Sequence, residues 1–415
     1  MREGQDFASL YIDFDSFFAR AEQHFRPQLR NRPVGVIPLR TPHTCLIAAS
    51  PEAKRFGIKT GTPVIEALQA CPEIKLVVAR HDVYVRLHHE ILAVVGDVVP
   101  IHKTCSIDEV ACRLLRNERA AAIELARTIK RALAARIGPT LTCSIGLAAN
   151  ELLAKIAAEM DKPDGLVALR NEELPGRLLG LKLTDIPGIG KGNAARLERA
   201  RVKTIAELWA LPSAQMRALW DGVEGERFWA FLHGFEIERE KTQRGMFGHS
   251  RVLARDWRGV ERTEACARLL LVKAMRRMRR DDFAASALSL GLKSETGYDW
   301  TADYRGPPFR DDHTALDCLQ SLFKRAHRSG GIGRTKKVQV LLHGLVAAGS
   351  IQRDLLETPE HRRSRQRWER LADLTDALHT RYDEPVVTLG PHLGSPGQYA
   401  GSKIAFGRIP ALADF

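Results

Sequence analysis

The chain has 415 residues, 44% of them hydrophobic and 27% charged, and it carries a formal net charge of +13. This length predicts about two to four domains, and the composition excludes a disordered or membrane-spanning chain. The positive charge favours a polyanionic partner such as nucleic acid, because each phosphate that Lys or Arg neutralises releases condensed counterions.

The cysteines and the N-terminus indicate the cellular setting. The seven cysteines are scattered without a C-x-x-C pair, which argues against a disulfide framework and against a zinc site. The first residues lack the basic and apolar regions of a signal peptide. No apolar run approaches the roughly 20 residues that span a bilayer. We therefore expect a cytoplasmic protein that does not engage a membrane.

The first 170 residues alternate between strand-like and helical patterns. Residues 8–14 are apolar and β-prone and end in Asp13-Phe14-Asp15, which predicts a short buried strand with carboxylates at its end. Residues 27–78 are broken into short elements by Pro33, Pro42, Pro51, Pro63 and Pro72. Helices are expected at 16–23, 81–95, 118–136 and 150–160, and strands at 101–107 and 140–146. This order predicts a sheet layered with helices.

The sequence pattern changes near Asn171. Residues to about Glu238 are helical in pattern and contain Ile186-Pro-Gly-Ile-Gly190, and the charged segment 239–248 has the composition of a linker. From residue 249 two strand-like runs are interleaved with helical segments, at Ala287–Lys293 and Lys337–Leu342. A basic helix is expected at Arg362–Tyr382, before a glycine- and proline-rich tail without predicted regular structure.

Three carboxylates carry the chemistry that the sequence suggests. Asp13 ends one predicted strand, while Asp108 and Glu109 lie at a turn between two apolar runs. If these elements are neighbours in one sheet, the three side chains converge, as two-metal phosphoryl transfer requires. Repulsion among three anions makes Mg²⁺ the expected partner. The alternative interpretation is a turn aspartate and a solvated acidic pair.

Four motifs and one longer region, in order, resemble the Y-family DNA polymerases, the low-fidelity enzymes of the DinB and UmuC type. The paired signatures are Tyr11-Ile-Asp-Phe-Asp-Ser-Phe-Phe18 and Ser106-Ile-Asp-Glu109. Leu153–Gly165 is similar to the palm helix and its following turn, and Asp185–Lys191 to the helix-hairpin-helix of the thumb. Residues 245–345 resemble the DNA-binding little finger.

The resemblance implies an α+β multidomain right-hand fold. It has a ferredoxin-like palm (1–24 and 78–170), small fingers (25–77), a helical thumb (171–238), a linker (239–248), an α/β little finger (249–348) and a tail of unknown role (349–415). It also implies a translesion polymerase that adds deoxynucleotides to a primer 3′-hydroxyl. The expected partners are primer-template DNA, dNTPs and two Mg²⁺ ions, for which Mn²⁺ could substitute. The chain is expected to be a monomer.

The resemblance assigns site residues by position. Asp13, Asp108 and Glu109 are the implied catalytic metal ligands, with the carbonyl of Phe14 as a fourth. Phe18 matches the steric gate, whose ring excludes a ribose 2′-hydroxyl, although an amphipathic helix also accounts for a buried aromatic there. The implied nucleotide-binding residues are Phe17, Phe18, Lys54 and Lys162.

The expected DNA contacts lie in two places. The hairpin of Gly188, Gly190 and Lys191 presents backbone N–H groups to a phosphate. In the basic run Lys273–Arg280 we expect Arg276 and Arg277 to face phosphates, aided by Arg334 and Lys336 at a strand start. A solvated charged face is the alternative for this run.

Several positions depart from the family pattern. Pro51 and Lys54 stand where the family carries Tyr and Arg on the triphosphate, and Glu151 stands where a basic residue is common. A lysine loses the bidentate fork of arginine, so we expect weakened triphosphate binding.

Other classes of protein stay open at this point. They are a catalytically weak or inactive DNA-binding accessory protein and, more remotely, a nucleotidyl cyclase. A sliding clamp is a candidate partner, with Gln320–Phe323 and Ala411–Phe415 as weak candidate peptides for binding it.

Overall fold

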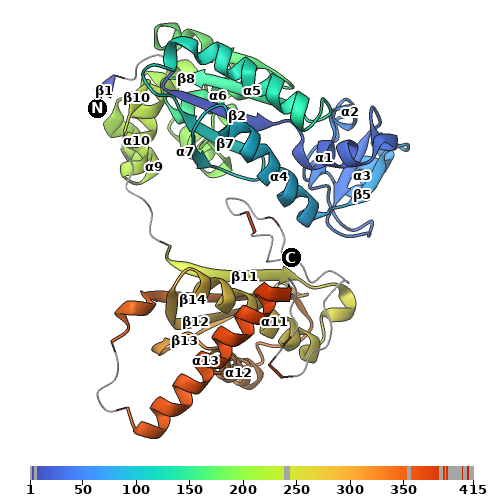
Figure 1. The fold of residues 1–415 in the computed structure, drawn as a ribbon, viewed down its shortest axis with the longest axis vertical. Helices are drawn as coiled ribbons and strands as arrows, with labels where there is room; N and C mark the ends of the chain where they lie inside the picture. The colour runs from blue at the N-terminus through green and yellow to red at the C-terminus, as the bar shows by residue number, and fades with distance from the viewer. Residues whose placement is uncertain are drawn as a thin grey trace. The chain divides into compact units, whose positions relative to one another are not determined.

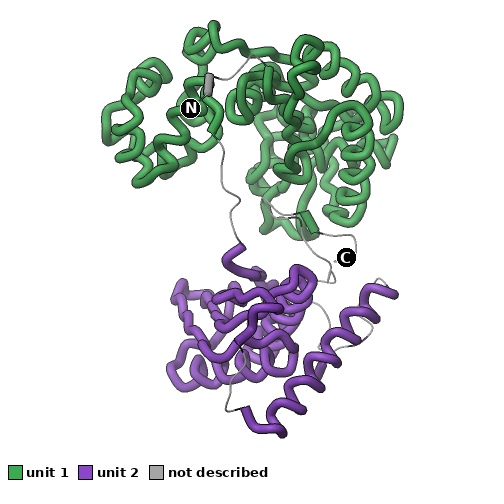
Figure 2. Tube along the Cα trace, turned by 60° about the vertical axis from the view of Figure 1, so that its left-hand side comes forward, with its two compact units in different colours: residues 1–240, 403–412 green, residues 241–402, 413–415 purple. Residues whose placement is uncertain are grey.

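The structure is a computed structural model, and it describes residues 2–3, 7–237, 244–352, 357–382, 387, 389–390, 404 and 409–410. It separates into two compact units, the first within residues 1–240 and 403–412 and the second within residues 241–402 and 413–415 (Figure 2). The elements of each unit are labelled in Figure 1.

A five-stranded sheet forms the centre of the first unit. Its strand order is β6 (Ile101–Thr104), β7 (Glu109–Arg113), β2 (Ser9–Phe14), β8 (Cys143–Ala148) and β9 (Leu166–Ala168). All six residues of β2 are buried, because β7 and β8 flank the strand and α6 (Glu151–Met160) packs on it (Figure 1). Strand β2 is therefore a rigid platform for the carboxylates at its end.

Two groups of shorter elements complete the first unit. A three-stranded sheet of β4 (Ala48–Ala49), β3 (Val34–Ile37) and β5 (Lys75–Val78) packs with short helices. Helix α1 (Phe17–Phe25) precedes this sheet, and α2 (Pro51–Lys54) and α3 (Val64–Ala70) connect β4 to β5. Helices α4 (His81–Gly96) and α5 (Ala122–Arg136) follow it. The helices beyond β9 are α7 (Lys191–Arg199), α8 (Ile205–Trp209), α9 (Ser213–Trp220) and α10 (Val223–Leu232), and β1 (Arg2–Glu3) pairs with β10 (Phe235–Glu236).

The second unit is an antiparallel sheet packed against two helices. The strand order is β11 (Met246–Val252), β14 (Thr335–Ala347), β12 (Phe283–Ser294) and β13 (Asp299–Phe309). Leucines and valines of β12 and β14 join α11 (Val260–Arg280) and α12 (Asp312–Arg328) in one apolar core. The tail contributes α13 (Pro359–Tyr382), which packs on α12 (Figure 1).

The structure corrects several sequence-based boundaries. The helix predicted from Glu118 begins at Ala122, and the strands predicted at 101–107 and 140–146 are β6 and β8. Strands β11 and β13 were not predicted, and β11 takes three residues from the expected linker. Both are half-exposed edge strands, so they lack the apolar runs that mark β12 and β14. The edge position of β13 also explains how it accommodates Pro307 and Pro308.

Within the described ranges, no helix combines the length and the apolar character that crossing a bilayer requires.

The contact between α6 and β8 depends on Gly146. A Cβ added to this residue would lie 1.9 Å from the carbonyl oxygen of Ala154 and 2.4 Å from the amide nitrogen of Ala158. These are backbone atoms of α6, so they cannot rotate away. We expect Gly146→Ala to lower the free energy of unfolding by about 3 kcal/mol, measured by urea denaturation.

Gly96 at the end of α4 provides the control, because a Cβ there meets nothing within 4 Å. Gly96→Ala should leave the stability unchanged or raise it by up to about 1 kcal/mol. Equal stability of the two variants would contradict the close packing of α6 on β8.

Candidate active site

The predicted carboxylates lie on neighbouring strands. Asp13 of β2 is directly opposite Glu109 of β7 in the antiparallel register, and the amide N–H of Phe14 donates to the carbonyl of Asp108 at 2.9 Å. Directly opposed residues place their side chains on the same face about 5 Å apart. The structure therefore brings together residues 13, 108 and 109, which are far apart in the sequence.

The turn that carries Asp108 is held by local hydrogen bonds. The amides of Cys105 and Ser106 both donate to the carbonyl of Glu109, at 2.9 and 3.2 Å, and close the β6–β7 hairpin. The Ser106 hydroxyl donates to Asp108 Oδ1 at 2.5 Å. Because the backbone is fixed on both sides, the Asp108 side chain can change its partner without moving the chain.

His88 of α4 supports this turn from behind. Its Nδ1 lies 2.8 Å from the carbonyl oxygen of Ile107, and both residues are buried. Burial lowers the pKa of His88 to about 4, so the ring is neutral at pH 7. Since a carbonyl can only accept, the tautomer with the proton on Nδ1 makes the bond.

Burial disfavours the charged forms of Asp13 and Asp108. Asp13 is 7% exposed, and burial raises its pKa to about 7 even though Lys162 opposes the shift. Burial also raises the pKa of Asp108, against the hydrogen bond from Ser106. Desolvation of this kind disfavours the charged form unless a cation compensates.

Two lysines provide that compensation. Lys162 Nζ lies 2.8 Å from Asp13 Oδ2, and Lys155 Nζ lies 2.5 Å from Glu109 Oε1. Lys162 is also the residue expected to contact a phosphate of the nucleotide. The contact of Lys155 with Glu109 was not predicted. The spacing of Lys155, Glu159 and Lys162 along one side of α6 and its C-terminal end is the signal that could have found it.

The donor set fits a hard divalent cation. All three side chains offer carboxylate oxygens, which Mg²⁺ prefers. In this structure the ammonium groups of two lysines contact two of the carboxylates. In the part of the chain that the structure describes, no three His, Cys, Asp or Glu side chains are grouped closely enough to hold a metal ion. In this structure Lys162, Lys155 and Ser106 contact Asp13, Glu109 and Asp108, respectively.

Asp15, two residues beyond Asp13, has a separate structural role. Its carboxylate accepts from the hydroxyls of Thr142 and Ser144 and from the amide of Asp164, each at 2.9 Å. These bonds tie the end of β2 to β8 and to the turn that follows Lys162.

The two phenylalanines after the site lie in different environments. Phe17 is 2% exposed, so any contact that it makes with a ligand involves its backbone. Phe18 is partly exposed, and its ring stacks on Tyr84 with centroids 4.6 Å apart. The Tyr84 hydroxyl donates to buried Glu22 at 2.8 Å, which fixes the aromatic pair in place.

Lys54 lies at the end of α2 and is exposed. The helix begins at Pro51, and the Ser50 hydroxyl caps it by accepting from the Ala53 amide at 3.3 Å. Glu52 accepts a bond from Gln23 of α1 at 3.0 Å. The helix is therefore held against α1, with Lys54 on its outer side.

The glycine hairpin leads into α7. Gly188 has a φ of +95°, and Gly190 is the N-cap residue of α7. The side-chain amide of Asn193 donates to the Gly188 carbonyl at 2.9 Å and closes the loop. Lys191 is exposed at the first turn of the helix.

The predicted DNA-binding residues of the second unit differ in environment. Lys336 is exposed, and Arg334 is exposed but paired with Glu295 at 2.9 Å. Arg276 is partly buried and donates to the Thr380 hydroxyl at 3.4 Å. Arg277 lies 2.9 Å from His249 Nε2, which ties it to β11.

The basic run on α11 is not a uniform charged face. Arg279 falls on its buried side, and its guanidinium donates to Asp312 of α12 and Asp376 of α13. Arg279 is therefore not available to phosphates, and the contacts expected of Arg276 and Arg277 stay predictions. The helical period places Arg279 beside Met275 and Met278 in the core.

The segment Gln320–Phe323 lies within α12. Leu322 and Phe323 are buried in the apolar core, so they are not available to bind a clamp. The second candidate peptide, at 411–415, lies outside the described residues.

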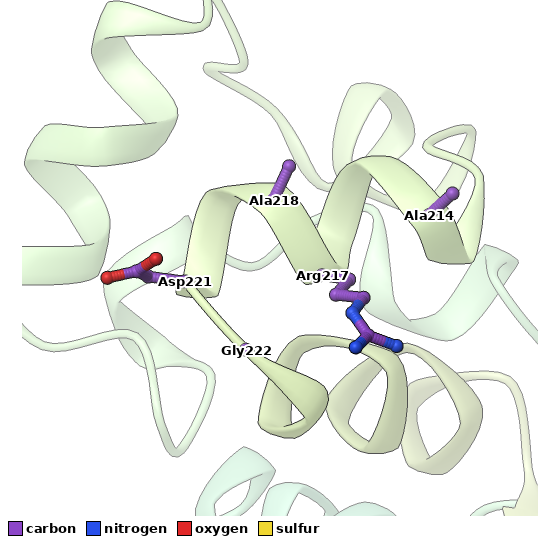
Figure 3. Close-up of a pocket in the computed structure, with 5 residues that line it drawn as sticks. All are labelled: Ala214, Arg217, Ala218, Asp221 and Gly222. Atoms are coloured by element: carbon purple, nitrogen blue, oxygen red, sulfur yellow. The ribbon is translucent and has the colours of Figure 1, made fainter.

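A surface hollow of about 420 Å³ lies at the turn between α9 and α10 (Figure 3). It is lined by Ala214, Arg217, Ala218, Asp221 and Gly222, and the two charged side chains point away from each other. Arg217 pairs with Glu226 at 3.1 Å. None of the predicted site residues lines this hollow, so the candidate site remains the end of β2 and β7.

Two family models match the chain. The model described as the impB/mucB/samB family matches residues 12–159, and the model of the C-terminal domain of the same family matches residues 244–355. The first match contains all three carboxylates.

Curated relatives extend over almost the entire chain. A DNA polymerase IV of Moorella thermoacetica is 33% identical over 411 residues, which cover 96% of this chain and 99% of the relative. A DNA polymerase IV of Pelotomaculum thermopropionicum is 30% identical and covers 90% of this chain and 92% of its own.

Solved structures share the fold. A Y-family DNA polymerase chimera of Dbh and Dpo4 aligns with a TM-score of 0.68 at 23% identity, over 81% of this chain and 99% of the chimera. DinB from Sulfolobus solfataricus aligns with a TM-score of 0.54 at 23% identity, over 82% of this chain and 99% of its own.

The hydrogen bond from His88 to Ile107 can be tested by substitution. His88→Leu leaves a buried carbonyl without its partner, so we expect the free energy of unfolding to fall by about 1–3 kcal/mol. His88→Asn places a side-chain nitrogen near the position of Nδ1 and should recover most of that loss. Chemical denaturation of both variants measures the difference, and equal stabilities would argue against the bond.

Proposed function

Since this chain belongs to the impB/mucB/samB family of Y-family DNA polymerases, we propose that it performs two-metal nucleotidyl transfer at Asp13, Asp108 and Glu109. The protein is a DNA-directed DNA polymerase of the translesion, error-prone type. The observation that carries the proposed site is the pairing of Asp13 with Glu109 beside the turn of Asp108.

The three carboxylates and the Phe14 carbonyl would hold two Mg²⁺ ions. When bound, these ions would activate the primer 3′-hydroxyl and stabilise charge on the triphosphate. Lys162, which lies 2.8 Å from Asp13, offers a point charge to the phosphates of the incoming nucleotide. Lys155 and Ser106 keep Glu109 and Asp108 oriented on one side of the sheet.

Phe18 would act as the steric gate. Its ring is held by the stack on Tyr84, whose hydroxyl is bonded to Glu22. A fixed ring excludes an added ribose 2′-hydroxyl more strongly than a mobile one, because it cannot yield. This arrangement favours dNTPs over ribonucleotides.

The remaining parts would position the DNA. The hairpin of Gly188, Gly190 and Lys191 would contact a phosphate of the primer-template. Arg276, Arg277, Arg334 and Lys336 would add phosphate contacts in the second unit, with Arg277 and Arg334 the more constrained because they are already paired. We propose the roles of palm (1–24, 78–170), fingers (25–77), thumb (171–238) and little finger (249–348) on this basis. We further propose a monomer that works in the cytoplasm.

The metal proposal is tested at Asp108. Asp108→Ala removes a ligand of both proposed ions, so primer extension with Mg²⁺ and four dNTPs should fall by at least about 10³-fold. Asp299→Ala, in an exposed strand of the second unit, is the control and should extend primers like the wild type. Activity of the Asp108 variant within about tenfold of the wild type would contradict the assignment.

Lys54 provides the test of nucleotide binding. Because lysine offers a point charge rather than a fork, Lys54→Arg should lower the KM for dNTP and Lys54→Ala should raise it, each by about three- to tenfold. Single-nucleotide insertion on a primed template measures both. Lys59→Ala, an exposed lysine nearby in the chain, should leave the KM unchanged. A KM that does not respond to either Lys54 variant would remove this residue from the binding site.

A further inference from the structure

Helix α13 lies beyond the family match, which ends at residue 355. It is nevertheless fixed to the second unit. The buried guanidinium of Arg279 donates to Asp376 at 2.7 and 3.0 Å, and to Asp312 at 2.8 and 3.2 Å. The ring of His313 stacks on Trp368 with centroids 4.1 Å apart. These contacts hold one face of α13 against α11 and α12.

A second face of the helix, about 100° around its axis from the buried one, is apolar and exposed. The inner face buries Ala372, Thr375 and His379, which are 2%, 8% and 5% exposed. Beside this face lie Leu371, Leu374, Leu378 and Tyr382, which are 38%, 63%, 37% and 55% exposed. Their spacing of three, four and four residues places them in one row along the helix. We call these four residues the α13 stripe.

Arginines border the α13 stripe. Arg363, Arg367, Arg370 and Arg381 are exposed, and at 100° per residue they project along one edge of the stripe. The acidic residues Glu369, Asp373 and Asp376 project from other sides of the helix. The exposed face is therefore both apolar and strongly positive.

We propose that the α13 stripe and its arginine border bind an acidic amphipathic helix of a protein partner. An apolar row with i, i+3 and i+7 spacing is the complement of a helix that carries its own apolar row. Burial of the leucines against the partner's row would stabilise the complex, and glutamates beside that row would pair with the arginine border.

Other occupants fit the same face less well. A second copy of α13 would bring arginines against arginines along the shared row, and like charges at an interface are repelled. A DNA backbone would satisfy the arginines but leave the leucines in water. An acidic amphipathic helix is favoured because it complements both the apolar row and the arginine border.

The anchoring of α13 makes this surface ready to bind. Because the Arg279 contacts and the His313–Trp368 stack already order the helix, a partner does not have to offset the entropy of folding it. The arrangement separates two roles on one helix, with one face for attachment and the other for recognition.

The test uses the full chain and a fluorescent helical peptide of about 18 residues, with leucines at i, i+3 and i+7 and glutamates beside them. Fluorescence anisotropy should show binding of this peptide and none of a scrambled peptide with the same composition. Leu374→Ser/Leu378→Ser should weaken binding by at least about tenfold. The matched control is Leu179→Ser, which removes a leucine that is 50% exposed in the first unit and should change nothing.

Charge reversal sharpens the test. Arg367→Glu/Arg370→Glu should lose the glutamate peptide and gain the equivalent peptide with lysines in place of the glutamates. Circular dichroism and unchanged primer extension verify that the variants fold. The proposal is overturned if the wild type does not distinguish the peptide from its scrambled form. It is also overturned if the charge-reversed variant loses affinity for duplex DNA or phosphatidylserine vesicles while the leucine variant binds the peptide like the wild type.

Discussion

The pairing of β2 with β7 is the constraint on which the site depends. It sets Asp13 opposite Glu109 and bonds the Phe14 amide to the carbonyl of Asp108. A slip of one residue would turn Asp13 to the other face of the sheet, where it could not meet the other two carboxylates. The burial of every residue of β2 protects this register, because a slip would move each side chain into a closely packed space that another side chain fills.

Burying several carboxylates together carries a desolvation penalty, and neighbouring lysines reduce it. Burial raises the pKa of Asp13 and Asp108, and the lysines at 155 and 162 supply the nearest positive charges. These lysines belong to α6 and its C-terminal end, and α6 packs closely on the sheet because residue 146 is glycine. Packing and electrostatics are therefore linked through one helix.

Much of the first unit could be predicted from the sequence, because its strands and helices carry clear periodic patterns and the carboxylates follow apolar runs. The edge strands β11 and β13 could not, because their exposed faces break the apolar pattern. The roles of His88 and Lys155 also escaped prediction. Each acts through a contact with a residue 19 or more positions away. His88 carries no local signal, and the spacing of Lys155 with Glu159 and Lys162 indicates a charged row on α6 but not its partner Glu109.

The burial of Arg279 makes the tail a structural part of the second unit. Asp376 shares the neutralisation of this guanidinium with Asp312. A chain that stopped before Pro359 would retain every strand of the sheet. Arg279 would then keep Asp312 as its partner, but it would lose Asp376 and the helix that covers it. Removing one partner of a buried ion pair destabilises a protein more than replacing the whole pair with apolar residues. Part of the stability of this unit therefore comes from residue 376, well beyond the last strand of the sheet.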